Sequence, residues 1–139
     1  MKKLLFLPFL LTYNLFASDM QSKEMSIQQM KEQNKEIVKL AASEMSKSLP
    51  YQINDLTTLL VVKANNTTLE YIYEIVTTPK SDKSIQEEDH SAMKKQVTKG
   101  TCKSSKRFLE ADITITYIYK SKKSKKELFR FKIKQENCF

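Results

Sequence analysis

The segment LTTLLVVKANNTTLEYIYEIVTT, residues 56–78, decides the fold class. It contains two runs that are rich in β-branched and aromatic residues, and Asn65 and Asn66 separate them. Asparagine tolerates the positive φ angles that a two-residue hairpin loop requires. In the second run one strand face is apolar and aromatic, formed by Leu69, Tyr71, Tyr73 and Ile75. The segment therefore predicts a β-hairpin.

A second pair of patterned runs lies near the other end, ADITITYIYK at 111–120 and ELFRFKIKQ at 127–135. The triplet YIY occurs in both halves of the chain, at 71–73 and at 117–119, which is compatible with a duplicated α-β-β unit. Alternation predicts a second hairpin whose apolar face holds Ile113, Ile115, Tyr117, Tyr119, Phe129, Phe131 and Ile133. Its lysine-rich connection, KSKKSKK, predicts a solvated loop.

Helical periodicity appears before and between these hairpins. Residues 20–49 lack Gly and predict an amphipathic helix that Pro50 ends, with apolar positions at Ile27, Met30, Ile37, Val38, Ala41, Met45 and Leu49. The methionines fit core packing or an adaptable binding groove, and core packing is the commoner role. A short helix is predicted over 91–99 with Gly100 as its left-handed stop, after a polar loop at 78–92.

These elements predict an α+β fold. An N-terminal amphipathic helix precedes an antiparallel sheet of about four strands in two hairpins, with a short helix between the hairpins. We expect the helices to cover one face of the sheet.

The N-terminus predicts export. Lys2 and Lys3 precede an apolar run at 4–11, and the small residues Ala17 and Ser18 follow, as in a secretory signal peptide. The run is shorter than the roughly 20 residues that span a bilayer, and the alternative of a buried helix lacks a polar face. We expect a signal peptide at 1–18 and one domain at 19–139. A periplasmic or secreted location follows, with no transmembrane segment after cleavage.

The cysteines Cys102 and Cys138 predict a disulfide, because an even count in an exported chain favours pairing. The alternatives are a reactive thiol and a metal site. A structural zinc site normally takes four Cys or His ligands, whereas this chain has two Cys and one His, His90. We expect neither a metal nor a cofactor.

Positive charge is concentrated late in the chain. Residues 19–93 hold 8 basic and 12 acidic side chains, whereas residues 94–134 hold 14 basic and 3 acidic ones. A candidate contact for an anionic partner comprises Lys120, Lys122, Lys123, Lys125, Lys126, Arg130, Lys132 and Lys134. Nucleic acid is disfavoured, since Phe129 and Phe131 alternate to the other strand face. The strong preference for Lys over Arg also fits a compositional bias.

Enzymatic signatures are absent from the sequence. The chain contains one glycine, Gly100, so it cannot form a glycine-rich phosphate-binding loop. The acidic stretch Glu87–Asp89 beside His90 is the one acid–histidine cluster, and a solvated loop explains it more simply. We therefore predict no catalytic residues.

Several stretches resemble a group of small exported bacterial α+β proteins that have one cysteine pair and no assigned activity. The resemblance rests on LPYQINDLTTL (49–59), LEYIYEI (69–75), Cys102, ITYIYK (115–120) and Cys138. It implies the α+β fold and the disulfide, and it supplies no activity.

Three hypotheses of function follow. The leading one is an exported non-enzymatic protein that binds a protein partner or an anionic envelope component through the basic hairpin. The alternatives are an accessory subunit of a secretion or surface assembly, which would use a sheet edge or the amphipathic helix, and an enzyme that uses His90 or Cys102.

Overall fold

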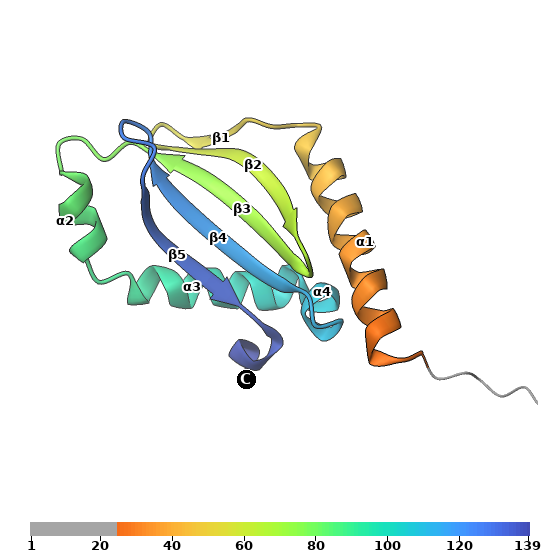
Figure 1. Cartoon of the computed structure of the whole chain (residues 1–139). Coiled ribbons are helices and arrows are strands. Elements are labelled where there is room, and N and C mark those ends of the chain that lie inside the picture. Colours follow the sequence, from red (N-terminus) through yellow and green to blue (C-terminus); the bar gives the residue numbers. More distant parts are fainter. Residues whose placement is uncertain (1–24) are drawn as a thin grey trace, which may run out of the picture.

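Figure 1 shows the computed structural model of the chain, which describes residues 25–139. The signal peptide predicted at 1–18 lies outside the described residues. The helices are α1 (Ile27–Ser46), α2 (Asp82–Glu87), α3 (Ser91–Ser104), α4 (Lys106–Glu110) and the 3-10 helix η1 (Gln135–Cys138). The strands are β1 (Tyr51–Asn54), β2 (Thr57–Asn65), β3 (Thr68–Ile75), β4 (Thr114–Ser121) and β5 (Glu127–Ile133).

The strands form one five-stranded sheet in the order β1-β2-β3-β4-β5. Neighbouring strands are antiparallel except for β3 and β4, which are parallel. The α+β class is as predicted, whereas the prediction of about four antiparallel strands is wrong. The helices α2, α3 and α4 form a crossover that returns the chain to the end of the sheet where β3 begins, so β4 must run parallel to β3.

Both predicted hairpins are present. The first loop lies one residue later than the predicted Asn65–Asn66. Asn65 belongs to β2 and pairs with Thr68, so the loop consists of Asn66 and Thr67, and Asn66 adopts a positive φ of 52°. The second hairpin joins β4 to β5 through the lysine-rich residues 122–126, all of which are exposed.

The repeated YIY triplet has a structural explanation in the parallel pair. Tyr71 pairs with Tyr117, and Tyr73 pairs with Tyr119. The ring centroids of these two pairs lie 5.2 and 5.0 Å apart and the rings are stacked. The two triplets therefore form adjacent stretches of one sheet.

The core lies on one face of the sheet, between the strands and the helices. Under α1, Val38 and Ala42 pack with Val62, Leu69 and Ile113. Under α3 and α4 a second cluster is formed by Leu109, Ile115 and Ile133. Figure 1 shows the sheet in front of α3, and no helix of the described chain crosses the near face of the sheet.

The helices differ from the prediction in their bounds and number. A capping box between Ser26 and Gln29 starts α1, and residues 20–24 of the predicted helix lie outside the described residues. The stop predicted at Gly100 is wrong, because α3 continues to Ser104 and Gly100 does not adopt a positive φ. Three helices, rather than one short helix, separate the hairpins, because α2 forms in the segment 78–92 that was expected to be a loop and α4 follows α3.

Cys102 in α3 and Cys138 in η1 form a disulfide, with their Cα atoms 5.6 Å apart. The bond links the crossover to the segment that follows β5. Both cysteines pack against the core cluster of Leu109, Ile115 and Ile133, so the bond holds η1 and α3 together at the edge of that core.

We predict that the double variant Cys102→Ser/Cys138→Ser loses about 4 kcal/mol of unfolding free energy, because the bond closes a loop between residues 36 positions apart. Urea unfolding followed by circular dichroism measures the loss. The reduced wild type is the control and should match the variant. An unchanged unfolding midpoint in both would contradict the prediction.

Candidate partner-binding groove

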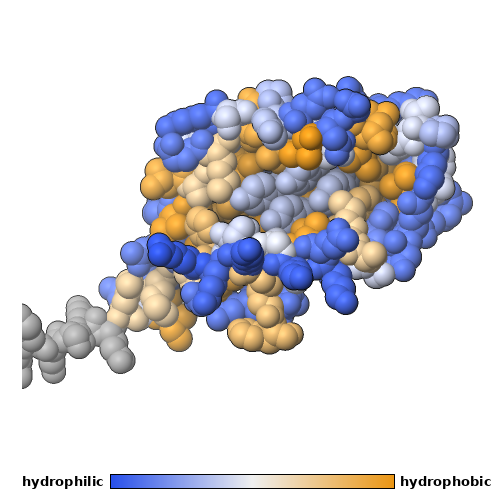
Figure 2. Space-filling model, turned by 180° about the vertical axis from the view of Figure 1, so that it is seen from behind, coloured by the Kyte–Doolittle hydropathy of each residue, from blue (hydrophilic) through white to orange (hydrophobic). Residues whose placement is uncertain are grey.

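The helix-bearing face of the sheet is incompletely covered. An open groove of about 470 Å³ lies where α1 and α3 leave the ends of β3, β4 and β5 uncovered. Figure 2 shows this face, with a hollow bordered by hydrophobic side chains. We call it the aromatic groove, and its lining residues are Ile53, Asn54, Leu56, Thr57, Tyr73, Ile75, Val76, Met93, Tyr119 and Phe129.

Stacked rings from three strands form the floor of the aromatic groove. The ring centroids of Tyr73 and Tyr119 lie 5.0 Å apart, and those of Tyr119 and Phe129 lie 4.6 Å apart. Strand register places these rings side by side, because each projects from the same face of its strand. Stacked rings have few accessible rotamers, so the floor is a rigid apolar surface.

Exposed aliphatic side chains form the rim. Ile53 is 49% exposed, Leu56 is 57% exposed and Met93 is 37% exposed. Backbone contacts hold this rim in place, because the Val76 N–H donates to the Leu56 carbonyl at 2.8 Å. Contiguous exposed apolar side chains around a hollow are typical of an interaction site.

The sequence reasoning missed this site. Ile53 precedes the patterned segment 56–78, Leu56 begins it, and Met93 lies in the predicted helix, so only the fold brings the rim residues together. The one available signal was a pair of large apolar residues, Ile53 and Leu56, flanking the polar turn residues Asn54 and Asp55.

The floor is electrically neutral. Burial, together with neighbouring tyrosines, raises the pKa of Tyr71 and of Tyr119 to about 12, and the pKa of Tyr73 also lies above its ordinary value. Two of the stacked tyrosine hydroxyls already have hydrogen-bond partners within the protein. The Tyr71 hydroxyl donates to Met45 Sδ at 3.2 Å, and the Tyr117 hydroxyl lies 2.8 Å from Thr101 Oγ1.

His90 and Cys102 have structural contacts. The His90 ring stacks on Phe129 at 3.9 Å, and His90 Nε2 lies 2.9 Å from the Ile85 carbonyl oxygen. Cys102 is in the disulfide, so it offers no thiol nucleophile. Within residues 25–139 no group of three His, Cys, Asp or Glu side chains is placed to hold a metal ion.

The predicted basic contact lies elsewhere on the molecule. Lys122, Lys123, Lys125 and Lys126 are in the β4–β5 loop. Arg130 and Lys132 are exposed on β5, where they pair across from Ile118 and Thr116 on the face that bears no helix. Lys120 lies on the same face near the end of β4, and Lys134 follows β5. That this set contacts an anionic partner stays a prediction.

Acidic groups compensate several of these charges. Lys125 Nζ lies 2.6 Å from Glu74, whose side chain is 10% exposed. Arg130 pairs with Glu127, and the hydrogen bond from this guanidinium lowers the pKa of Glu127. Ser124 and Ser121 lower the pKa of Asp82 by hydrogen bonding, with a smaller contribution from Lys123. The hairpin surface is therefore less positive than its sequence suggests.

Comparison with known proteins identifies a family and a fold. The family model of a domain of unknown function, DUF8479, matches residues 19–129. No curated protein sequence matches the chain. Among the described residues, no helix combines the length and the apolar character needed to cross a membrane.

Three solved structures are similar to this chain in fold. A candidate secreted protein from Pseudomonas aeruginosa has a TM-score of 0.71 and 12% identity, with 79% of this chain and 96% of that chain covered. The type II secretion pilotin EpsS from Vibrio vulnificus has a TM-score of 0.65 and 9% identity, with 81% and 97% covered. The type II secretion pilotin AspS from Vibrio cholerae has a TM-score of 0.58 and 14% identity, with 80% and 97% covered. These identities establish the fold alone.

We predict that the unfolding free energy falls as the pH rises from about 10 to about 12. An unfolded tyrosine ionises near 10, whereas Tyr71 and Tyr119 ionise near 12 in the fold. Their contribution is thus complete below pH 10 and is lost as the pH rises toward 12. Urea unfolding at pH 8 to 11 measures this decline. The variant Tyr71→Phe should show a shallower decline, and identical pH profiles would contradict the prediction.

Proposed function

This chain belongs to the family of the domain of unknown function DUF8479, and we propose that it is an exported, non-enzymatic accessory subunit of a secretion or surface assembly. It binds a protein partner through the aromatic groove. The single observation that carries this proposal is the combination of a rigid aromatic floor with an exposed aliphatic rim.

The lining of the groove favours a protein segment over a small polar ligand. No lining residue carries a charge, and the polar members are limited to Asn54, Thr57 and the tyrosine hydroxyls. Small-molecule sites usually enclose most of their ligand and orient it with several convergent polar groups. A shallow apolar hollow with aromatic anchors instead suits apolar side chains presented by another protein.

The proteins that share this fold support the proposal of a secretion or surface assembly. Two of the proteins that share it are pilotins of type II secretion systems, and a third is a candidate secreted protein. None of these names denotes an enzyme. A location in the periplasm or outside the cell fits both these neighbours and the predicted signal peptide.

We predict that a photo-crosslinking amino acid at position 56, expressed in the native cell, captures a component of an envelope assembly. The rim variant Leu56→Asp should reduce co-purification of that component at least tenfold, because a carboxylate beside the aromatic floor would be buried without a partner.

Leu40→Asp is the matched control, since Leu40 lies on the outer side of α1 and is 66% exposed. This variant should retain the captured component. Circular dichroism checks that both variants fold. Equal recovery with Leu56→Asp and Leu40→Asp would overturn the role of the groove.

The basic hairpin remains a second candidate contact, for an anionic envelope component. The observation in its favour is that Arg130 and Lys132 are exposed on the helix-free face, next to the exposed loop lysines. This site and the aromatic groove lie on opposite faces of the sheet, so they can be tested separately.

We expect charge reversal at Lys122, Lys123 and Lys126 to weaken capture of an anionic envelope component and to reduce its salt dependence. Lys125 stays unchanged because it pairs with Glu74. The control reverses the exposed lysines Lys31, Lys63 and Lys83. Capture at 50, 150 and 400 mM salt measures the effect. An unchanged salt response after reversal in the loop would remove the hairpin as a contact.

A further inference from the structure

The outer side of α3 carries an uncompensated row of positive charge. Its sequence, SAMKKQVTKGTCKS, contains four lysines and no acidic residue. Lys94, Lys95, Lys99 and Lys103 are all exposed, and no carboxylate of residues 25–139 lies within ion-pair distance of them. The hairpin lysines differ, because Glu74 and Asp82 contact or approach them.

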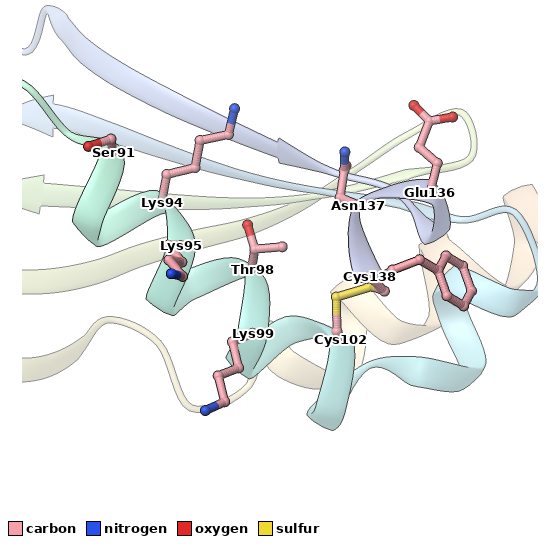
Figure 3. Close-up of a pocket in the computed structure, with 10 residues that line it drawn as sticks. Ser91, Lys94, Lys95, Thr98, Lys99, Cys102, Glu136, Asn137 and Cys138 are labelled. Carbon is pink, nitrogen blue, oxygen red and sulfur yellow. A yellow bond between two sulfur atoms is a disulfide. The ribbon is translucent and has the colours of Figure 1, made fainter.

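The fold fixes the orientation of this row. On the inner side of α3, Val97 packs against the core and Thr101 is 2% exposed, and Cys102 is tied to η1. The four lysines are exposed along α3, and Figure 3 shows Lys94, Lys95 and Lys99 projecting from the helix in different directions around the depression beside η1. They span nine residue steps, or about 14 Å along the helix axis.

An exposed aromatic side chain lies beside the lysines. A depression of about 670 Å³ between α3 and η1 is lined by Lys94, Lys95, Lys99 and Phe139. Phe139 is 98% exposed.

The acidic groups nearby are engaged by other partners. Glu136 lines the depression and lies 3.8 Å from Lys134. Asp89 accepts hydrogen bonds at 2.9 Å from both the Ser91 backbone N–H and the Ser91 hydroxyl.

We propose that α3 and Phe139 bind the surface of a bilayer that contains anionic phospholipids. A row of lysines about 14 Å long matches several headgroups rather than one ion, and each lysine near such a surface contributes about 1 kcal/mol. Phe139 supplies the apolar group that enters the headgroup region. The inference goes beyond the proposed function and does not depend on it.

This binding mode orients the molecule. The helix α3, which carries the lysines, and the aromatic groove belong to the same helix-bearing side of the sheet. Docking through α3 therefore holds the groove close to the membrane surface, within reach of a partner that is itself in the membrane.

The variant Phe139→Trp provides a direct test, because the chain contains no tryptophan. We expect its fluorescence to shift to the blue when vesicles of phosphatidylglycerol and phosphatidylcholine are added at 50 mM salt. The shift should disappear at 400 mM salt and with vesicles of pure phosphatidylcholine.

Neutralising Lys94, Lys95 and Lys99 to Gln should weaken vesicle binding about a hundredfold, which corresponds to about fivefold for each lysine. The matched control neutralises the same number of charges at the exposed lysines Lys31, Lys63 and Lys83, and it should change binding less than threefold. Vesicle co-sedimentation measures both variants.

Three results would overturn the proposal. The first is no blue shift with anionic vesicles at low salt. The second is an equal loss in the two triple variants, which would indicate net charge alone. The third is tight binding of soluble poly-glutamate without vesicle binding, which would assign the row to an acidic protein partner.

Discussion

The parallel pairing of β3 with β4 is the constraint on which the rest of the structure depends. Two consecutive strands can run parallel only if the chain crosses back between them, and here α2, α3 and α4 make that crossover. The crossover places α3 and α4 on the same face as α1, so one layer of helices must cover a sheet of five strands. That layer is too small to cover the whole face, and the uncovered part is the aromatic groove.

The same pairing explains how far sequence reasoning could reach. Local signals were sufficient for the hairpins, because Asn66 supplies a positive φ and strand alternation identifies the inner residues. The parallel partner of β3 was not local, since β4 begins 39 positions after β3 ends. β1 was missed because four exposed residues after Pro50 show no buried face. The groove depends on all of these long-range contacts, so its rim could not be derived from spacing.

The surface charge of the hairpin and of α3 also depends on long-range contacts that the sequence does not reveal. The density of lysines in the hairpin loop is obvious in the sequence, yet Glu74, the residue that pairs with Lys125, lies 51 positions away. The lysines of α3 are more widely spaced and attract less attention. They have no ion-pair partner among residues 25–139, because α3 itself has no acidic residue and Glu136, which lines the same depression, pairs with Lys134. The free charge of a protein surface therefore follows from the fold as much as from composition.

The stack of four tyrosine rings across β3 and β4 has a consequence for spectroscopy. The rings of Tyr71, Tyr73, Tyr117 and Tyr119 stack in contact across β3 and β4, and the chain has no tryptophan to mask them. Transition dipoles at such separations couple, so the near-ultraviolet circular dichroism of the folded protein should be dominated by these four rings. That signal exists only while β3 and β4 are in register. The molecule thus carries an intrinsic optical reporter of the strand pairing that organises it.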